Sequence, residues 1–436
     1  MNIRRTIRQK TARMYETGAL HITAGTFLTK FVAFFGSVVV VRLLSKEDYG
    51  VMSYVENLYS YALVFAALGM SNAILRYLVI AESAEEKKAC YRYIIRRSVV
   101  INLGITAVLI AAGLLVPFPD KYAAARYLVP VAALILPFQD LVNDGLFTIR
   151  AFFKNRLYAW AAFISAVALI LGRIAGALTA QVNGVLWSRV LINAAFAVAG
   201  LVFIGRKFFP REEVPDLSAE QKRTINVYSL QYMITNGFWA IFMLNDKFML
   251  GLLLNDPAGL ADYNVASVLP GNIAIFAMAI GIFVGPLFTK NEKDPEWVRR
   301  NFRRVYLTGA AVVGGVSLLV ALLAGPLTGL IYGEQYLNTV GLMRLLTLGA
   351  FINSGLRYTT ANILAAMGEI KFNMIISGAG IVVQILLDLI LIPSMGITAV
   401  AVSNCIVFFG MAAALLAFFY NRHYRIRPDR DKARTE

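Results

Sequence analysis

Apolar runs, each about as long as a membrane crossing, constrain this chain more than any other feature of its sequence. The first run extends from Ala19 to Leu43, and Lys30 is its one charge before Arg42. A helix rises about 1.5 Å per residue, so a run of this length spans the roughly 30 Å hydrocarbon core of a bilayer with some tilt. The sequence therefore predicts a membrane helix here.

The composition agrees with lipid as the solvent. Charged residues make up 16% of the 436 residues, where a soluble protein carries about 25%. Two cysteines (Cys90 and Cys405) and two histidines (His21 and His423) lie in unrelated contexts, so we expect no disulfide framework, metal site or cofactor. A net charge of +16 would suggest nucleic acid for a soluble chain. Here its distribution indicates orientation in a membrane, and we expect no nucleic-acid partner.

Twelve runs of this kind can be counted between charged segments, which predicts an all-α integral membrane protein with twelve transmembrane helices. The predicted spans are 20–43, 51–78, 97–117, 124–149, 157–179, 184–205, 226–254, 263–289, 304–326, 338–363, 372–392 and 396–420. The predicted organisation is a basic amphipathic segment at 1–18, a six-helix lobe at 19–205, a linker at 206–225, a second six-helix lobe at 226–420 and a basic tail at 421–436.

The loops between these spans follow the positive-inside rule. The side that holds both termini collects 32 of the 42 Lys and Arg residues. The opposite side collects five, which are Arg42, Lys46, Lys121, Arg126 and Arg173. This bias predicts cytoplasmic termini, and it supports the helix count because one missed span would reverse every later loop.

Three pairs of similar motifs recur at a nearly constant offset. Tyr49 and Tyr263, each after an acidic turn, are 214 residues apart, Asn143 and Asn353 are 210 apart, and Gly184 and Gly396 are 212 apart. Two related halves are an arrangement that many transporters use. We therefore expect two pseudo-symmetric six-helix lobes around a central cavity.

Ten charged residues fall inside the predicted spans, where a charge at the bilayer centre costs about 2.5 to 3.5 kcal/mol. The cations are Lys30, Arg189, Lys247, Arg344 and Arg357, and the acids are Glu56, Asp140, Asp144, Asp246 and Asp388. Because the signs balance, structural ion pairs between helices are one explanation. The alternative is a solvated cavity, which we expect for Asp140 and Asp144 because they lie one turn apart.

Two further features concern bending and anchoring. Pro270-Gly271 and Gly285-Pro286 in the eighth span allow a helix to bend, as alternating access requires. Arg76, at the inner end of the second span, is either an interface anchor or a substrate contact.

Several segments resemble the polysaccharide-exporter branch of the multidrug/oligosaccharidyl-lipid/polysaccharide flippase superfamily, the group of O-antigen and capsule repeat-unit flippases. They are the turn RLLSKEDYG at 42–50, NDKFMLGLLL at 245–254 and GLADYNVAS at 259–267. The resemblance implies a flippase that moves a polyprenyl-pyrophosphate-linked oligosaccharide from the cytoplasmic to the outer leaflet of the bacterial cytoplasmic membrane. It also implies that Lys30 and Arg76, with Lys247, lie where cations face the cavity.

A pyrophosphate needs cations in a region of low dielectric constant, and sugars need amide and aromatic groups. Candidate residues for the head group are Lys30, Arg76, Arg189, Lys247, Arg344 and Arg357, and those for the sugars are Asn57, Tyr61, Asn236 and Asn353. Asp140, Asp144 and Asp388 are candidates for coupling to H+ or Na+. The polymerase and glycosyltransferases of the same pathway are candidate partners.

Two other functions remain open at this stage. One is a cation-coupled multidrug or small-molecule exporter of the same superfamily. The other is a membrane enzyme of the pathway, an acyltransferase or polymerase. Neither histidine lies deep in a span, and no predicted outer loop is long. We therefore expect a transporter and no catalytic residues.

Overall fold

The computed structural model describes residues 19–210 and 212–424, and in these ranges every regular element is a helix. Nine of the helices found there are long and apolar enough to cross a membrane. The prediction of an all-α membrane protein is confirmed, while the count of twelve crossings stays a prediction. Residues 1–18 and 425–436, which hold the predicted amphipathic segment and most of the tail, lie outside the described residues.

Contacts within the chain divide it into two compact units, the first ending at Phe248 and the second beginning at Met249. This boundary lies inside α9 (Ala219–Leu253), after the linker expected at 206–225. The earlier part of α9 is tied to the first unit by side chains. Ser229 Oγ donates to Met70 Sδ at 3.4 Å, and Asn57 Nδ2 donates to the Leu244 carbonyl at 3.2 Å.

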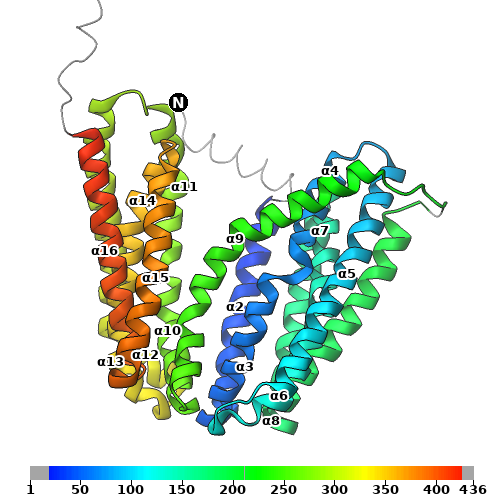
Figure 1. Cartoon of the computed structure of the whole chain (residues 1–436), viewed down its shortest axis with the longest axis horizontal. Coiled ribbons are helices and arrows are strands. Elements are labelled where there is room, and N and C mark those ends of the chain that lie inside the picture. The colour runs from blue at the N-terminus through cyan, green and yellow to red at the C-terminus, as the bar shows by residue number, and fades with distance from the viewer. Residues whose placement is uncertain (1–18, 211, 425–436) are drawn as a thin grey trace, which may run out of the picture. The chain divides into compact units, whose positions relative to one another are not determined.

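In the first unit, long helices run side by side (Figure 1). They are α2 (Ala19–Leu43), α3 (Lys46–Val64), η1 (Ala66–Gly69), α4 (Met70–Ile80), α5 (Ala84–Leu115), η2 (Asp120–Tyr122), α6 (Ala125–Ala133), α7 (Ile135–Ala151), α8 (Asn155–Lys207) and most of α9. Ser45 caps α3 and Ser83 caps α5 through their side-chain oxygens, as expected for helix starts.

The second crossing of the first unit is broken between α3 and α4. Ala67, Leu68 and Gly69 all have positive φ angles there. A Cβ at Gly69 would lie 2.4 Å from the Ser229 carbonyl oxygen, so only glycine permits α9 to approach this closely. The break is therefore built into the packing of α9 against this crossing.

α8 is one long element that reverses direction at Ala180 and Gln181, whose backbone angles are not helical. The two arms pack against each other through Gly176 and Gly184, since a Cβ on Gly176 would lie 2.2 Å from the Gly184 carbonyl oxygen. α8 thus contains both of the spans predicted at 157–179 and 184–205, joined as a tight antiparallel hairpin.

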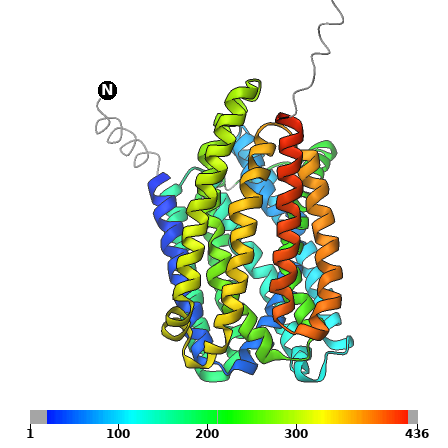
Figure 2. The same cartoon turned by 90° about the vertical axis from the view of Figure 1, so that its left-hand side faces the viewer.

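The second unit contains α10 (Pro257–Asn272), α11 (Ala274–Lys290), α12 (Pro295–Tyr332), η3 (Glu334–Thr339), α13 (Val340–Phe351), the π-helix η4 (Ile352–Arg357), α14 (Tyr358–Ala366), α15 (Ile370–Met395) and α16 (Thr398–His423). Figure 2 shows α15 and α16, in orange and red, packed side by side. Phe419 of α16 stacks on Phe302 of α12 with ring centroids 3.6 Å apart.

Helix breaks recur at corresponding places in the two units. α10 and α11 meet at Ile273, just after Pro270-Gly271, where bending was expected. The helix continues through Gly285-Pro286, so a break there is not observed. α6 meets α7 at Leu134, and the π-helix η4 interrupts the equivalent crossing of the second unit. Each unit therefore contains two interrupted crossings, α3–α4 and α6–α7 in the first and α10–α11 and α13–α14 in the second, which agrees with the repeat seen in the sequence.

Candidate binding site

A polar cavity of about 460 Å³ lies within the first unit. Its walls come from α2, α3, α7 and α8. The polar residues that line it are Thr29, Glu56, Tyr59, Ser60, Gln139, Asn143, Ser165, Arg173, Arg189 and Asn193. The volume far exceeds the roughly 10–15 Å³ that a single water molecule requires. The cavity therefore has room for a group of several atoms together with its water.

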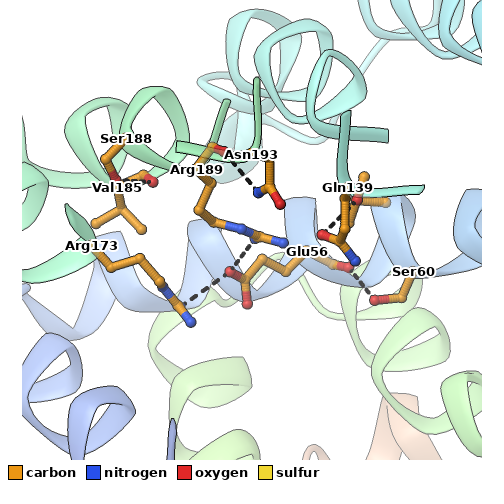
Figure 3. Close-up of polar contacts among 9 residues, drawn as sticks. Glu56, Ser60, Gln139, Arg173, Val185, Ser188, Arg189 and Asn193 are labelled. Carbon is orange, nitrogen blue, oxygen red and sulfur yellow. Dashed lines mark hydrogen bonds and ion pairs between the residues drawn. The ribbon is translucent and has the colours of Figure 1, made fainter. Parts of the chain in front are cut away.

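Two arginines of α8 converge on one carboxylate of α3 in this cavity (Figure 3). Glu56 Oε1 lies 2.9 Å from Arg189 Nη1 and 3.3 Å from Arg173 Nη2. The Arg189 guanidinium also lies over the Tyr59 ring, 5.4 Å from its centroid. The side chains of Arg189 and Arg173 are 14% and 19% exposed, while that of Glu56 is 31% exposed. The charges are thus partly withdrawn from solvent but remain accessible from the cavity.

The hairpin of α8 explains why these arginines meet. Gly176 of the first arm packs on Gly184 of the second, and Gly172 faces Ser188 and Ile192. Residues equally distant from the turn lie at the same level of an antiparallel pair. Arg173, about two turns before the reversal, therefore comes level with Arg189, about two turns after it.

The electrostatic balance at the cavity is positive. Arg173, Arg189 and Glu56 line it, and Lys247 of α9, which also interacts with Asp246, attracts Glu56 as well. Guanidinium groups bind phosphate oxygens through pairs of parallel N–H donors. Such a site can accept an anion whose oxygens compete with Glu56 for the arginine donors.

Neutral polar groups next to these charges are held in place by hydrogen bonds. Tyr59 Oη donates to Gln139 Oε1 at 3.1 Å, which links α3 to α7. Ser60 Oγ donates to the Glu56 carbonyl at 2.7 Å, and Asn193 Nδ2 donates to the Arg189 carbonyl at 2.8 Å. Phenol, amide and hydroxyl groups of this kind suit the hydroxyl groups of a sugar.

An apolar cavity of about 360 Å³ adjoins the polar one. Val142, Leu146 and Ser165 line both of them. Trp160, Ile164 and Phe203 of α8 form part of its apolar wall and are themselves exposed on the helix surface. Polar and apolar spaces therefore lie next to each other along α7 and α8, as an amphipathic ligand would require.

The predicted cations of the first unit lie at several places. Arg189 forms an ion pair with Glu56, and Lys247 attracts the same carboxylate. Lys30 is exposed on α2, one residue after Thr29 of the cavity wall. Arg76 is exposed on α4, with its guanidinium 5.0 Å from the centroid of the Tyr228 ring.

The second unit holds the remaining predicted cations. Arg344 is exposed, and its Nε donates to the Ala321 carbonyl at 3.1 Å. Arg357 is buried at the end of the π-helix η4, and its Nε donates to Asn353 Oδ1 at 2.7 Å. Asn353, expected to contact sugars, is thus engaged by an arginine of its own helical segment.

The other predicted sugar contacts lie in the first unit. The buried Asn57 donates to the Leu244 carbonyl and so links α3 to α9. The Tyr61 ring packs on Phe248, with centroids 5.3 Å apart. Asn236 is exposed and donates to the Tyr232 carbonyl of its own helix. These residues are not among those that line the polar cavity.

The predicted ion-coupling acids are all buried. Asp140 and Asp144 lie on a different face of α7 from the cavity wall, and Asp388 of α15 accepts a bond from Ser403 Oγ at 2.5 Å. The expectation that Asp140 and Asp144 line a solvated cavity is wrong. Ser71 and Asn102 donate to Asp140 in place of water.

Glu56 and Arg173 are the charged site residues that sequence reasoning missed. Glu56 was expected only as one of several embedded acids, and Arg173 was counted with the charges of one membrane side. Arg173 instead lies inside α8, where it pairs with Glu56. The spacing of Arg173 and Arg189 around the reversal at Ala180 and Gln181 was the available signal.

Comparison with known proteins gives related sequences. A family described as polysaccharide biosynthesis protein matches residues 17–292. An uncharacterized membrane protein of Methanocaldococcus jannaschii is 23% identical over 424 residues, which cover 88% of this chain and 80% of that protein.

Solved structures with a similar fold include flippases and transporters. The lipid II flippase MurJ, in an inward closed conformation, aligns with a TM-score of 0.66 and 15% identity over 91% of this chain and 87% of its own. An inward-facing multidrug resistance MATE transporter of the MOP superfamily aligns with a TM-score of 0.68 and 15% identity, over 90% of this chain and 94% of its own. The chain therefore shares the fold of both.

Proposed function

The chain belongs to the polysaccharide biosynthesis protein family, and on this basis we propose that it is a flippase for a polyprenyl-pyrophosphate-linked oligosaccharide. It carries the molecule from the cytoplasmic to the outer leaflet by alternating access, for the synthesis of a cell-surface polysaccharide. The membrane is the cytoplasmic membrane of a bacterium, with both termini in the cytoplasm.

The observation that carries this proposal is the pair Arg173 and Arg189 at one cavity. A pyrophosphate brings about two negative charges into a region of low dielectric constant, where their desolvation is costly unless cations compensate them. Two guanidinium groups with Lys247 nearby provide that compensation. Glu56 holds the arginines in the absence of substrate and is displaced when the pyrophosphate arrives.

The rest of the substrate fits the neighbouring groups. The sugars contact Tyr59, Gln139 and Asn193 of the cavity wall, and the first prenyl units enter the apolar cavity beyond Leu146. The longer part of the lipid stays in the bilayer. The charged head group thus contacts the polar cavity, and the lipid tail contacts apolar surface.

The second candidate is the export of small molecules with coupling to a cation. It is favoured by the MATE transporter fold, which aligns about as well as that of MurJ. The positive charge balance of the cavity opposes it for cationic compounds, which Arg173 and Arg189 would repel.

Reconstitution into vesicles tests the proposal. A fluorescent polyprenyl-pyrophosphate oligosaccharide is expected to exchange between leaflets faster with the protein than without it. A polyprenol-linked analogue that lacks the phosphates serves as the comparison and should not be accelerated. Accelerated movement of a cationic dye, with no effect on the lipid-linked sugar, would favour the second candidate instead.

A further inference from the structure

Two acidic residues of α7, Asp140 and Asp144, are buried side by side in the interior of the first unit. Asp140 is 5% exposed and Asp144 is 0% exposed. They are one helical turn apart, so their carboxyl groups lie on the same face of α7. This face is turned away from Val142, Asn143 and Leu146, which line the polar cavity. The pair is therefore separate from the arginine site.

Asp140 is well provided with donors. Ser71 Oγ of α4 donates to its Oδ1 at 2.8 Å, and Asn102 Nδ2 of α5 donates to its Oδ2 at 2.6 Å. The orientation of the Asn102 amide is fixed, because its Oδ1 accepts the backbone N–H of Ala67 at 2.7 Å. A backbone N–H can only donate, so the NH2 group must face Asp140. Both oxygens of Asp140 thus meet donors, which suits an ionised carboxylate.

Asp144 is in the opposite situation. Neither of its carboxyl oxygens has a hydrogen-bond partner among the described residues, because the Ser71 hydroxyl, which also acts on Asp144, donates its one proton to Asp140. An ionised carboxylate in a buried site without donors or a counter-ion is far more costly than the neutral acid. A negative Asp140 one turn away adds to this cost. Asp144 therefore needs a bound proton for as long as the site keeps this geometry.

We propose that Asp144 is a proton-binding site of this protein, and that its proton controls the break in the second crossing through Asp140, Asn102 and Ala67. Ala67 is one of the residues of that break with a positive φ angle. If Asp144 loses its proton, two negative charges one turn apart repel each other, and the contacts of Asp140 must rearrange. The amide of Asn102 transmits that rearrangement to the backbone at Ala67.

The groups around the pair are consistent with a proton rather than a metal ion. Tyr59 of α3 acts electrostatically on Asp140, and Tyr91 of α5 acts on Asp144. From α8, Ile204 packs beside Gly145, next to Asp144. A metal ion would need several oxygen acceptors, whereas α4 and α5 present an O–H and an NH2 donor to Asp140. These donors favour a proton as the bound ion. Replacement of potassium by sodium in the experiment distinguishes a proton from a sodium ion.

A role of this proton in transport rests on the proposed function. Proton binding at Asp144 does not, since it can be measured without substrate. Infrared spectroscopy of the purified full chain in lipid nanodiscs should show the carbonyl stretch of a buried carboxylic acid at neutral pH. Asp144→Asn should remove this band and leave the fold intact, because an asparagine mimics the neutral acid. Asp140→Asn should retain it.

Hydrogen exchange at Ala67 provides the second readout. After correction for the intrinsic rate, exchange there should increase at high pH in the natural chain and should not respond to pH in Asp144→Asn. A band that persists in Asp144→Asn, or one that disappears when sodium replaces potassium at constant pH, would overturn the proposal. So would pH-dependent exchange at Ala67 that is the same in both proteins. A failure of the leaflet-exchange assay alone would count against the proposed function and not against this site.

Discussion

Arg189 and Glu56 lie on different crossings of the first unit, and their side chains meet with Nη1 and Oε1 2.9 Å apart. The same carboxylate oxygen also contacts Arg173 at 3.3 Å. A single acid thus neutralises part of the positive charge at this site. Under the proposed function, a bound pyrophosphate would compete with Glu56 for these two arginines.

Replacement of Glu56 by glutamine tests this competition. Glu56→Gln removes the competing charge and keeps the size of the side chain. We expect a soluble prenyl pyrophosphate to bind about tenfold more tightly, since about 1.4 kcal/mol corresponds to a factor of ten. The free protein should melt at a lower temperature, because two partly buried arginines lose their counter-ion. Calorimetric titration and thermal melting measure both effects, and equal or weaker binding would disprove the competition.

Removal of either arginine should impair transport. Hydrogen bonds to charged groups contribute about 1.5–3 kcal/mol, so Arg173→Ala and Arg189→Ala should each slow leaflet exchange by roughly tenfold to a hundredfold. Arg189→Lys should restore only part of the rate, because an ammonium group lacks the planar pair of donors. Arg206→Ala, on an exposed residue of the same helix, is the matched control and should exchange at the natural rate. An equal loss in that control would point to a general effect on the protein.

The hairpin of α8 should tolerate no side chain at Gly176. A Cβ there would lie 2.2 Å from a backbone oxygen of the other arm, so Gly176→Ala forces the arms apart and should cost about 1–3 kcal/mol of stability. Gly205→Ala lies on the same helix with nothing within 4 Å of its Cβ and should leave stability nearly unchanged. Unfolding of both variants under the same conditions, followed by circular dichroism, compares them. Equal stability would show that the glycine contact does not hold the arms together.

The apolar cavity should matter for long lipids and not for the head group. Leu146→Trp puts a larger side chain into the wall that the two cavities share. We expect leaflet exchange of the polyprenyl substrate to fall, while a soluble short-chain pyrophosphate still binds. Leu191→Trp, on a residue of α8 that is 64% exposed, serves as control. If both variants exchange the lipid at the natural rate, the tail does not use this cavity.

Several parts of the fold could be read from the sequence because the bilayer imposes length and polarity on each crossing. The apolar runs predicted the helices, and Pro270-Gly271 predicted the break before α11. The break at Ala67, Leu68 and Gly69 could not be predicted, because it depends on the approach of Ser229 from a helix far along the chain. The residues around Gly69 in the sequence do not indicate such a contact.

The candidate site was predicted only in part, for a similar reason. Arg189 and Lys247 were recognised as embedded cations, but the partner Glu56 was not singled out, because pairing across helices depends on how each helix is rotated. The sequence places Arg173 with the charges of one membrane side, and only the reversal at Ala180 and Gln181 brings it level with Arg189. Likewise, Asp140 and Asp144 looked solvated because the donors Ser71 and Asn102 come from other helices.

The binding of a soluble short-chain prenyl pyrophosphate to the purified protein tests the central claim most directly. Titration calorimetry compares the natural chain with the double variant Arg173→Gln and Arg189→Gln, which keeps polar side chains in the cavity. We expect binding to the natural chain and at least a tenfold weaker affinity in the double variant. The same affinity in both proteins would contradict it, because the pyrophosphate would then bind without the two arginines.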